Sequence, residues 1–234
     1  MRIHFLKLFV LFFLFSCSGK KNNHNGKTVF RYNEPKGITS LDPAFSRTMA
    51  NIWAVNQLYN GLVQMDDKTL VQPCIAKNWE VSKDGLVYTF HLRNNVYFHD
   101  NESFPDGKGR KISAFDFVYS FNRIVDEKVL SPGRWIFNNV DFSKGFSAPD
   151  DSTFIIHLKK PFPPFIGILT MQYCSVVPKE AVEYYGKDFG RNPVGSGSFK
   201  MKWWYEGVKL VLHKNENYFE TDGENRLPYL DAVS

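Results

Sequence analysis

The chain has 234 residues, a hydrophobic fraction of 43% and a formal net charge of +5. A chain of this length can bury a core without disulfide cross-links. Its lysine and arginine residues are scattered among acidic residues, without the basic helix or stripe that nucleic-acid-binding proteins present. The composition therefore excludes a nucleic-acid partner.

The first segment predicts export from the cytoplasm. A short basic head that contains Arg2 and Lys7 precedes an unbroken apolar run over residues 8–15. This run is shorter than the roughly 20 residues that a spanning helix needs, and polar residues follow it. The pattern is typical of a signal peptide, which we place at residues 1–16.

Cys17 ends a tetrapeptide that resembles the bacterial lipobox, in which the cysteine becomes the first residue after cleavage and carries a lipid. The polar residues 17–27 suit a tether. We therefore expect a chain that is anchored to a membrane through Cys17, on the periplasmic side of the cell envelope, without spanning it. The alternative is an ordinary signal peptide that contains a cysteine.

The first elements after the tether follow from residue periodicity. Residues 28–32 alternate like a short strand and lead into a turn-rich loop over residues 33–37. From Asn51 onward, apolar residues recur at steps of three and four, which predicts a helix that ends near Gly61. We expect one face of this helix to be buried.

A strand is predicted over residues 86–93, because apolar side chains occupy alternate positions and form one face. The Asn94-Asn95 step that follows tolerates left-handed turn geometry. The sequence therefore predicts a hairpin in which residues 96–98 pair with this strand.

The later elements mix strands and helices. Ser113 and Asp116 form a capping-box pattern at the start of the clearest helix. A strand is predicted over residues 154–158, a short helix over residues 178–185 and a hairpin over residues 198–213. Strands and helices interleave without strict alternation, which favours an α/β fold of mixed α+β character.

Catalytic and metal-binding patterns are missing from the sequence. The polar residues 99–102 lack the spacing and the glycine of a calcium loop. Residues 195–198, Gly-Ser-Gly-Ser, fit neither a phosphate loop nor a nucleophile elbow, so we interpret them as small residues that permit close backbone packing. Cys74 and Cys174 are predicted to be buried free thiols, with a disulfide between them as the alternative. We expect no enzyme activity, metal or cofactor.

A series of motifs runs in order from about residue 28 to the last residue. They are Ser40-Leu41-Asp42-Pro43, Leu58-Tyr59-Asn60-Gly61-Leu62-Val63, Ala76-Lys77-Asn78-Trp79-Glu80-Val81, Tyr88-Thr89-Phe90-His91-Leu92-Arg93, Ser113-Ala114-Phe115-Asp116-Phe117, Asn192-Pro193-Val194-Gly195 and Leu227-Pro228-Tyr229-Leu230-Asp231. Together they resemble the family-5 extracellular solute-binding proteins, the oligopeptide- and dipeptide-binding components of ABC importers. Here Gly-Ser-Gly-Ser stands where the family prefers Gly-Thr-Gly-Pro.

The resemblance implies the first lobe of a type II periplasmic-binding-protein fold, with an inserted subdomain. We expect residues 28–60 and 175–234 to form the main sheet of this lobe, and residues 61–174 to form the inserted subdomain. Family members continue for roughly as long again, so the second lobe is expected to be absent from this chain. In the family, two lobes close over the ligand.

The resemblance also implies where the ligand is held. The family uses the loop before the Leu-Asp-Pro motif and an aromatic residue beyond the long helix. In this sequence the loop supplies Glu34, Gly37, Ile38 and Thr39, and the aromatic residue is Trp135. Glu34 would pair with the amino terminus of a peptide, and its alternative is a solvated loop carboxylate. The alternative for Trp135 is a place in the core.

The function implied is a non-catalytic receptor, expected to be a monomer, that delivers oligopeptides or dipeptides to the permease subunits of an ABC importer. Nickel, haem or a sugar are alternative ligands within the range of the family. The alternative function is a truncated fragment that cannot support transport and acts at most as an interaction module.

Overall fold

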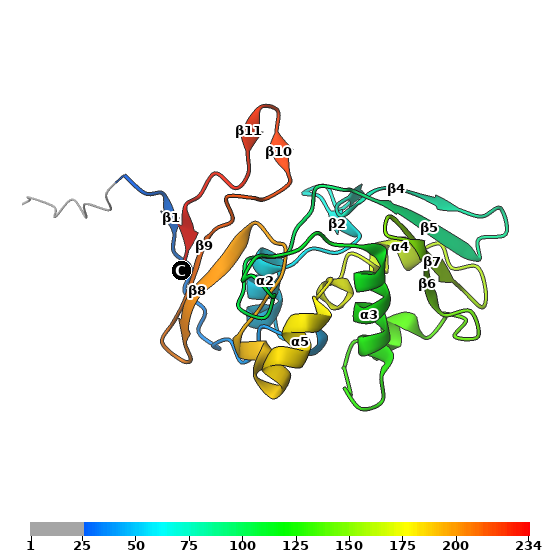
Figure 1. Cartoon of the computed structure of the whole chain (residues 1–234), viewed down its shortest axis with the longest axis horizontal. Coiled ribbons are helices and arrows are strands. Elements are labelled where there is room, and N and C mark those ends of the chain that lie inside the picture. Colours follow the sequence, from blue (N-terminus) through cyan, green and yellow to red (C-terminus); the bar gives the residue numbers. More distant parts are fainter. Residues whose placement is uncertain (1–25) are drawn as a thin grey trace, which may run out of the picture.

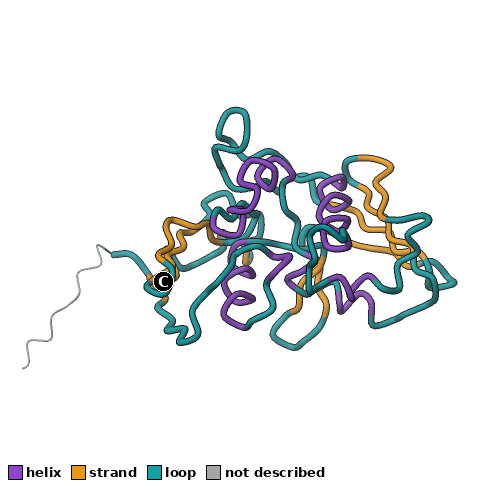
Figure 2. Tube along the Cα trace, turned by 90° about the horizontal axis from the view of Figure 1, so that it is seen from below, coloured by secondary structure: helices purple, strands orange, loops and turns teal. Residues whose placement is uncertain are grey.

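Two four-stranded sheets organise the molecule. The computed structural model describes residues 26–234, and the predicted signal peptide, Cys17 and most of the predicted tether lie outside the described residues. Figure 1 shows one sheet toward the left and the other toward the right, with α2, α5 and α3 between them. The view from below in Figure 2 gives the same arrangement, with most strands toward the two ends and helices between.

The first sheet has the strand order β1-β12-β9-β8. Its strands are β1 (Val29–Phe30), β12 (Ala232–Val233), β9 (Lys209–Lys214) and β8 (Phe199–Tyr205). The pair β8–β9 confirms the predicted hairpin. β1 runs parallel to β12, with Val29 opposite Ala232, so the beginning and the end of the described chain lie side by side (Figure 1).

The second sheet is antiparallel, with the order β4-β5-β7-β6. Its strands are β4 (Ala76–Val81), β5 (Val87–Leu92), β7 (Thr153–His157) and β6 (Phe146–Asp150). Alternate residues of β5 are buried, as predicted. The predicted hairpin to residues 96–98 is wrong, because β4 and β7 occupy both edges of β5 and Tyr97 forms a bridge with Lys111 instead.

Two small hairpins complete the strands. They are β2 (Val63–Met65) with β3 (Val71–Pro73), and β10 (Thr221–Asp222) with β11 (Asn225–Arg226). The α-helices are α2 (Met49–Leu58), α3 (Ala114–Val125), α4 (Phe165–Ile168) and α5 (Lys179–Tyr185). Short 3-10 helices are η2 (Pro43–Phe45), η3 (Arg134–Phe137), η4 (Gln172–Cys174) and η5 (Gly186–Arg191). None of the helices in the described part of the chain is long and apolar enough to cross a membrane.

Helix α3 begins as the capping pattern predicts. The carboxylate of Asp116 accepts hydrogen bonds from the backbone N–H of Ser113 at 2.8 Å and from its hydroxyl at 3.1 Å. These bonds satisfy groups that would otherwise lack partners at the helix start. The face that carries Phe117 and Phe121 is buried against the second sheet, and burial of each ring contributes roughly 1.5–3 kcal/mol.

The core is one continuous cluster of buried apolar residues that includes residues of both sheets. Within it, the ring of Phe121 packs against those of Phe137 and Phe154, with centroid distances of 4.8 and 5.4 Å. Cys74 and Cys174 are buried and free, as predicted. Burial raises the pKa of the Cys74 thiol to about 12, so this group is a neutral and unreactive part of the core.

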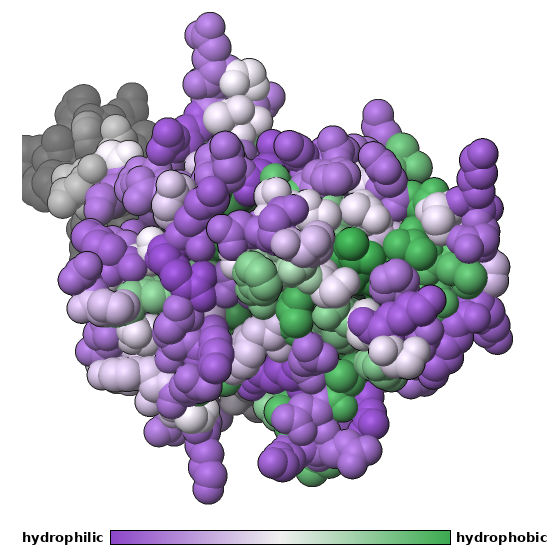
Figure 3. Space-filling view, turned by 45° about the vertical axis from the view of Figure 1, so that its right-hand side comes forward, coloured by the Kyte–Doolittle hydropathy of each residue, from purple (hydrophilic) through white to green (hydrophobic). Residues whose placement is uncertain are grey.

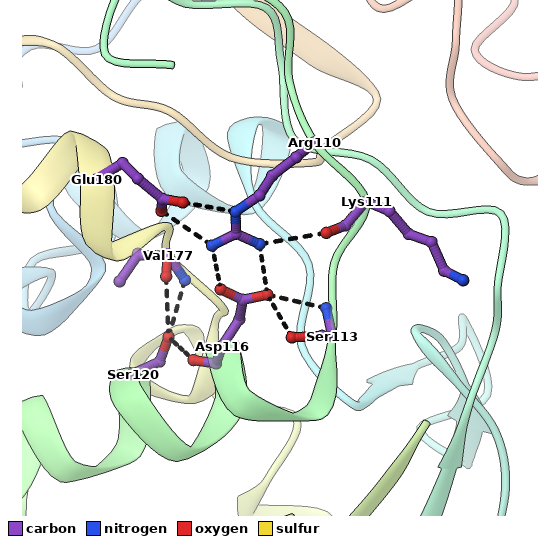
Figure 4. A network of polar contacts seen from close by, with 7 residues as sticks. All are labelled: Arg110, Lys111, Ser113, Asp116, Ser120, Val177 and Glu180. Atoms are coloured by element: carbon purple, nitrogen blue, oxygen red, sulfur yellow. Dashed lines mark hydrogen bonds and ion pairs between the residues drawn. The ribbon is translucent and has the colours of Figure 1, made fainter. Parts of the chain in front are cut away.

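A polar network joins α3 to α5 (Figure 4). The guanidinium of Arg110 donates to Asp116 at the start of α3 and to Glu180 in α5, each at 2.6 Å. Nearby, the Ser120 hydroxyl accepts a hydrogen bond from the backbone N–H of Val177 at 2.9 Å. Because Asp116 is almost fully buried, the network fixes α3 relative to the segment that leads back to the first sheet.

Candidate functional site

A groove of about 800 Å³ lies beside the first sheet. Its walls are residues 30–38, one face of α2, the β8–β9 hairpin and the end of β12. The volume is in the range of sites that hold small molecules and short peptides. We refer to it below as the groove.

The structure brings three of the predicted ligand residues together. Glu34, Gly37 and Ile38 line the groove. Thr39 follows Ile38 in the chain but does not line the groove, and it is hydrogen-bonded to Asn51 of α2. Trp135 is in η3 and is also not a lining residue. Trp135 is 49% exposed, so its alternative place in the core is wrong, and its role toward a ligand stays a prediction.

The loop that carries Glu34 is held at its far end by α2. The backbone N–H of Thr39 donates to the side chain of Asn51 at 3.0 Å, and the Asn51 amide donates back to the Thr39 hydroxyl at 3.1 Å. Two residues before Thr39, Gly37 has a φ of +69°, a conformation that glycine adopts without strain. The Glu34 carboxylate accepts a hydrogen bond from the backbone N–H of Lys36 at 3.0 Å. The loop is therefore a defined turn that points Glu34 toward the groove.

Two aromatic residues of the groove escaped the sequence prediction. The rings of Tyr32 and Trp53 are 4.9 Å apart at an angle of 37°, and both line the groove. Trp53 is in α2 but off the apolar stripe that predicted the helix. The position of Trp53 off this stripe was the sequence feature that could have identified it, because a tryptophan outside the buried face of an amphipathic helix must lie at the surface or in a cleft.

Exposed apolar side chains alone do not identify the site. Large exposed residues such as Leu130, Phe115 and Phe142 lie outside the groove. Figure 3, which brings the side of the second sheet forward, shows apolar residues in green that reach the surface there, among polar residues in purple. What distinguishes the groove is that aromatic surface is combined with a concave shape and with charged groups.

The charged side chains that line the groove have both signs. They are Arg31, Lys36 and Lys209, with Glu34 as the carboxylate. A ligand that carries an amino group and a carboxylate would find an opposite charge for each. Charge-assisted hydrogen bonds of this kind are about twice as strong as neutral ones.

A buried ion pair supports the segment between the loop and α2. Arg123 of α3 donates through two nitrogens to the carboxylate of Asp42, at 2.9 and 2.5 Å, and both side chains are at most 12% exposed. Asp42 also accepts a hydrogen bond from the backbone N–H of Ala44 at 2.9 Å, at the start of η2. The Leu-Asp-Pro motif is thus a structural junction beneath the site.

The Gly-Ser-Gly-Ser motif has the packing role that we inferred for it. A Cβ atom on Gly195 would lie 2.0 Å from the carbonyl oxygen of Leu58, and one on Gly197 would lie 2.4 Å from that of Gln57. Side chains cannot fit at such distances, so both positions require glycine. The motif places the strand β8 directly against the end of α2, which forms one wall of the groove.

A second depression of about 400 Å³ lies between residues 95–109 and the segment from Lys200 to Arg226. It is smaller, and none of the predicted ligand residues line it, so we take the larger groove as the candidate site. Over residues 26–234 no group of three or more histidine, cysteine, aspartate or glutamate side chains is placed to hold a metal ion.

The chain belongs to a known family of binding proteins. Residues 71–234 match the family described as bacterial extracellular solute-binding proteins, family 5 Middle. This confirms the family that the sequence motifs predicted. Its members bind solutes and are not enzymes, in agreement with the expected lack of catalysis.

Individual relatives agree with this assignment. The periplasmic oligopeptide-binding protein OppA of Salmonella typhimurium is 32% identical over 226 residues. A probable deoxycholate-binding periplasmic protein, YgiS of Escherichia coli, is 31% identical over 206 residues. Among solved structures, the periplasmic binding protein DppA of Helicobacter pylori, in complex with the peptide STSA, is 32% identical with a TM-score of 0.76.

The chain spans about 40% of the length of these relatives. The matches cover 89%, 81% and 89% of this chain, but only 40% of OppA, 37% of YgiS and 42% of the DppA chain. The mixed α/β fold described above therefore corresponds to part of a periplasmic peptide-binding protein structure.

Proposed function

We propose that this chain forms one side of the ligand cleft of an extracytoplasmic receptor, which binds oligopeptides or dipeptides and delivers them to the permease subunits of an ABC importer. The observation that carries the proposal is the groove, which is lined by Glu34, Gly37 and Ile38 together with aromatic side chains, in a chain that belongs to this family. The oligopeptide-binding relative OppA and the DppA structure in complex with a peptide add support.

The sheets support a division of the chain like that of a type II first lobe. All strands of the first sheet fall within residues 28–60 and 175–234, and all strands of the second fall within residues 61–174. We propose that the first range is the main part of the lobe and the second is the inserted subdomain. The groove lies on the main part, where a second lobe would close over the ligand.

The backbone around the groove suits an extended peptide. β1 is at the edge of the first sheet, and its last residue Phe30 and the following Arg31 line the groove. An edge strand presents N–H and C=O groups that can pair with an added strand. Such pairing gives affinity independently of the peptide sequence, which suits a receptor for varied peptides.

Isothermal titration calorimetry on the purified chain tests the function. We expect saturable binding of tripeptides such as Ala-Ala-Ala, and weaker binding when their amino terminus is acetylated. Glu34→Gln should weaken binding of the free peptide about tenfold, because a charge-assisted hydrogen bond is lost, and leave the acetylated peptide unaffected. Glu183→Gln, at an exposed position of α5 outside the groove, is the matched control.

Two outcomes of the calorimetry would contradict these expectations. If no di-, tri- or tetrapeptide produces heat, while deoxycholate or a sugar acid does, the ligand is not a peptide. If peptides bind but Glu34→Gln changes nothing, the peptide assignment stands and the role of Glu34 is wrong.

We further propose that the protein reaches the periplasmic side of the cell envelope through a signal peptide at residues 1–16 and stays there through a lipid on Cys17. The support is the sequence pattern, together with relatives that are periplasmic. Residues 17–27 would then act as the tether between the lipid and β1.

A further inference from the structure

The smaller depression, of about 400 Å³, is separate from the groove and shares no lining residue with it. One wall comes from residues 95–109, which follow β5, and the other from Lys200 of β8 and residues 215–226. None of its lining residues belongs to β1 or β12, the strands at the two ends of the described chain. Its volume is within the range of sites that hold small molecules.

Two cations with unused hydrogen-bonding groups line this depression. Lys200 is half-buried, and its ammonium group has neither a hydrogen-bond nor an ion-pair partner within residues 26–234. Arg226 of β11 donates from Nη1 to the carbonyl of Glu216 at 2.7 Å, and over the same residues it forms no ion pair. Because a guanidinium carries five N–H groups, most of those of Arg226 remain available to a ligand.

The carboxylate of Asp100, which also lines the depression, does not cancel these cations. It accepts hydrogen bonds from Nζ of Lys108 at 2.8 Å and from the backbone N–H of Gly109 at 3.0 Å. The hydrogen bond from Lys108 holds the pKa of Asp100 below its usual value, so this carboxylate is ionised and already paired. His99 is neutral near pH 7, because burial lowers its pKa to about 4. The net charge of the depression is therefore positive.

Further donors come from two amide side chains. Those of Asn95 and Asn217 line the depression and form no hydrogen bond within the described part of the chain. Asn217 is held in place through its backbone N–H, which donates to the side-chain oxygen of Asn215 at 3.1 Å. The unused groups thus come from four separate segments of the chain and are mostly donors, so they suit a ligand that offers several acceptor oxygens and a negative charge.

A phosphate group matches this arrangement better than a carboxylate does. A phosphate ester carries negative charge on oxygens that point in several directions, whereas the two oxygens of a carboxylate lie in one plane. Arginine is well suited to bind phosphate through parallel hydrogen bonds, and lysine adds a compact point charge.

We propose that this depression is a binding site for a phosphate ester of a small polar molecule, in which Lys200 and Arg226 bind the phosphate and Asn95 and Asn217 bind further oxygens. The ester would be either a soluble phosphomonoester or the headgroup of an anionic lipid, since both present the same charged oxygens. The site goes beyond the proposed function, because it is separate from the peptide groove and does not depend on it.

Isothermal titration calorimetry on the purified chain, at neutral pH and constant ionic strength, tests the inference. The probes are inorganic phosphate, glycerol 3-phosphate and glycerophosphoglycerol, with acetate and uncharged glycerol as comparisons. We expect saturable binding of at least one phosphate ester and none of glycerol. Lys200→Gln and Arg226→Gln should each weaken that binding about tenfold, because a charge-assisted hydrogen bond is lost. A tighter monoester indicates a soluble ligand, and a tighter diester indicates a lipid headgroup.

Two lysine variants are the matched controls. Lys202→Gln removes the same charge from the same strand at an exposed position outside the depression, and Lys209→Gln removes it from the groove. Neither should change phosphate binding. Urea denaturation of Lys200→Gln and Arg226→Gln, with midpoints like that of the wild type, separates a lost site from a lost fold.

The remaining outcomes overturn the inference. Equal weakening by Lys200→Gln and Lys202→Gln shows non-specific attraction to a basic surface, and weakening by Lys209→Gln alone places the anion in the groove. Acetate that binds as tightly as the phosphate esters shows that the site does not select phosphate. If no phosphate compound produces heat, the site does not exist, whether or not peptides bind in the groove.

Discussion

Acidification should destabilise the protein through His99, a buried residue outside the groove. The Nε2–H of His99 donates to the carbonyl of Gly197 at 3.0 Å, and its backbone N–H donates to the carbonyl of Gly195 at 2.7 Å. The side chain thus fixes the segment after β5 against the glycine motif. Burial lowers the pKa of His99 to about 4, although the hydrogen bond to the Gly197 carbonyl opposes the shift.

The sign and size of the effect follow from linkage. Above pH 6.5 the histidine is neutral in both the folded and the unfolded chain, and its full contribution to stability is present. As the pH falls from 6.5 to about 4, only the unfolded chain takes up the proton, which costs about 1.4 kcal/mol of unfolding free energy per pH unit. The total loss is therefore between about 3 and 4 kcal/mol, a large share of the stability of a typical domain.

Urea denaturation followed by tryptophan fluorescence at several values between pH 7 and pH 4 measures this loss. The comparison is with His99→Gln, whose amide can still donate to Gly197 but does not titrate. Carboxylates titrate equally in both proteins, so the difference between the two curves isolates His99. His213→Gln is the control for a histidine that is less deeply buried. Parallel curves for the wild type and His99→Gln would refute the reasoning.

Two further predictions concern the support of the site and the anchor. Asp42→Asn leaves the guanidinium of Arg123 buried without its counter-charge, so the free energy of unfolding, measured by urea denaturation, should fall by about 3 kcal/mol or more. Glu206→Gln, in the exposed pair with Arg191, should change this free energy little. Equal effects of the two substitutions would contradict the role of burial. When the whole chain is expressed in a bacterium, the product should be membrane-bound, and mass spectrometry should show an acyl group on Cys17. Cys17→Ser should release the protein to the soluble fraction. An unmodified cysteine in the wild type would exclude the anchor.

Local elements of the fold could be predicted from the sequence because their causes are local. The capping box at Ser113 and Asp116 and the alternation in β5 both act within a few residues of each other. The end of α2 was less well predicted: the helix stops at Leu58, before Gly61, because Tyr59 already has an extended backbone. The apolar pattern continues past the true end, since residues beyond a helix can also be buried.

Pairing between strands that are distant in the chain could not be predicted in the same way, although the local β8–β9 hairpin was. The hairpin expected from Asn94-Asn95 did not form, because β7, more than 60 residues away in the chain, takes the edge of β5 that the hairpin would have used. The free energy that a favourable turn sequence contributes is small compared with that gained when a whole strand is buried in a sheet. Only the three-dimensional competition between partners decides such a pairing.

The candidate site shows the same limit at the level of function. The family motifs led to Glu34, Gly37 and Ile38, which the structure places in the groove, but they gave no indication that Trp53 would meet Tyr32 there. The contact depends on β1, whose only strand partner among the described residues is β12. Since Val29 pairs with Ala232 across some 200 residues, the shape of the groove is determined by both ends of the described chain at once. A change in β12 should therefore alter the groove both through the position of Tyr32 and directly, because Val233 of β12 is itself a lining residue.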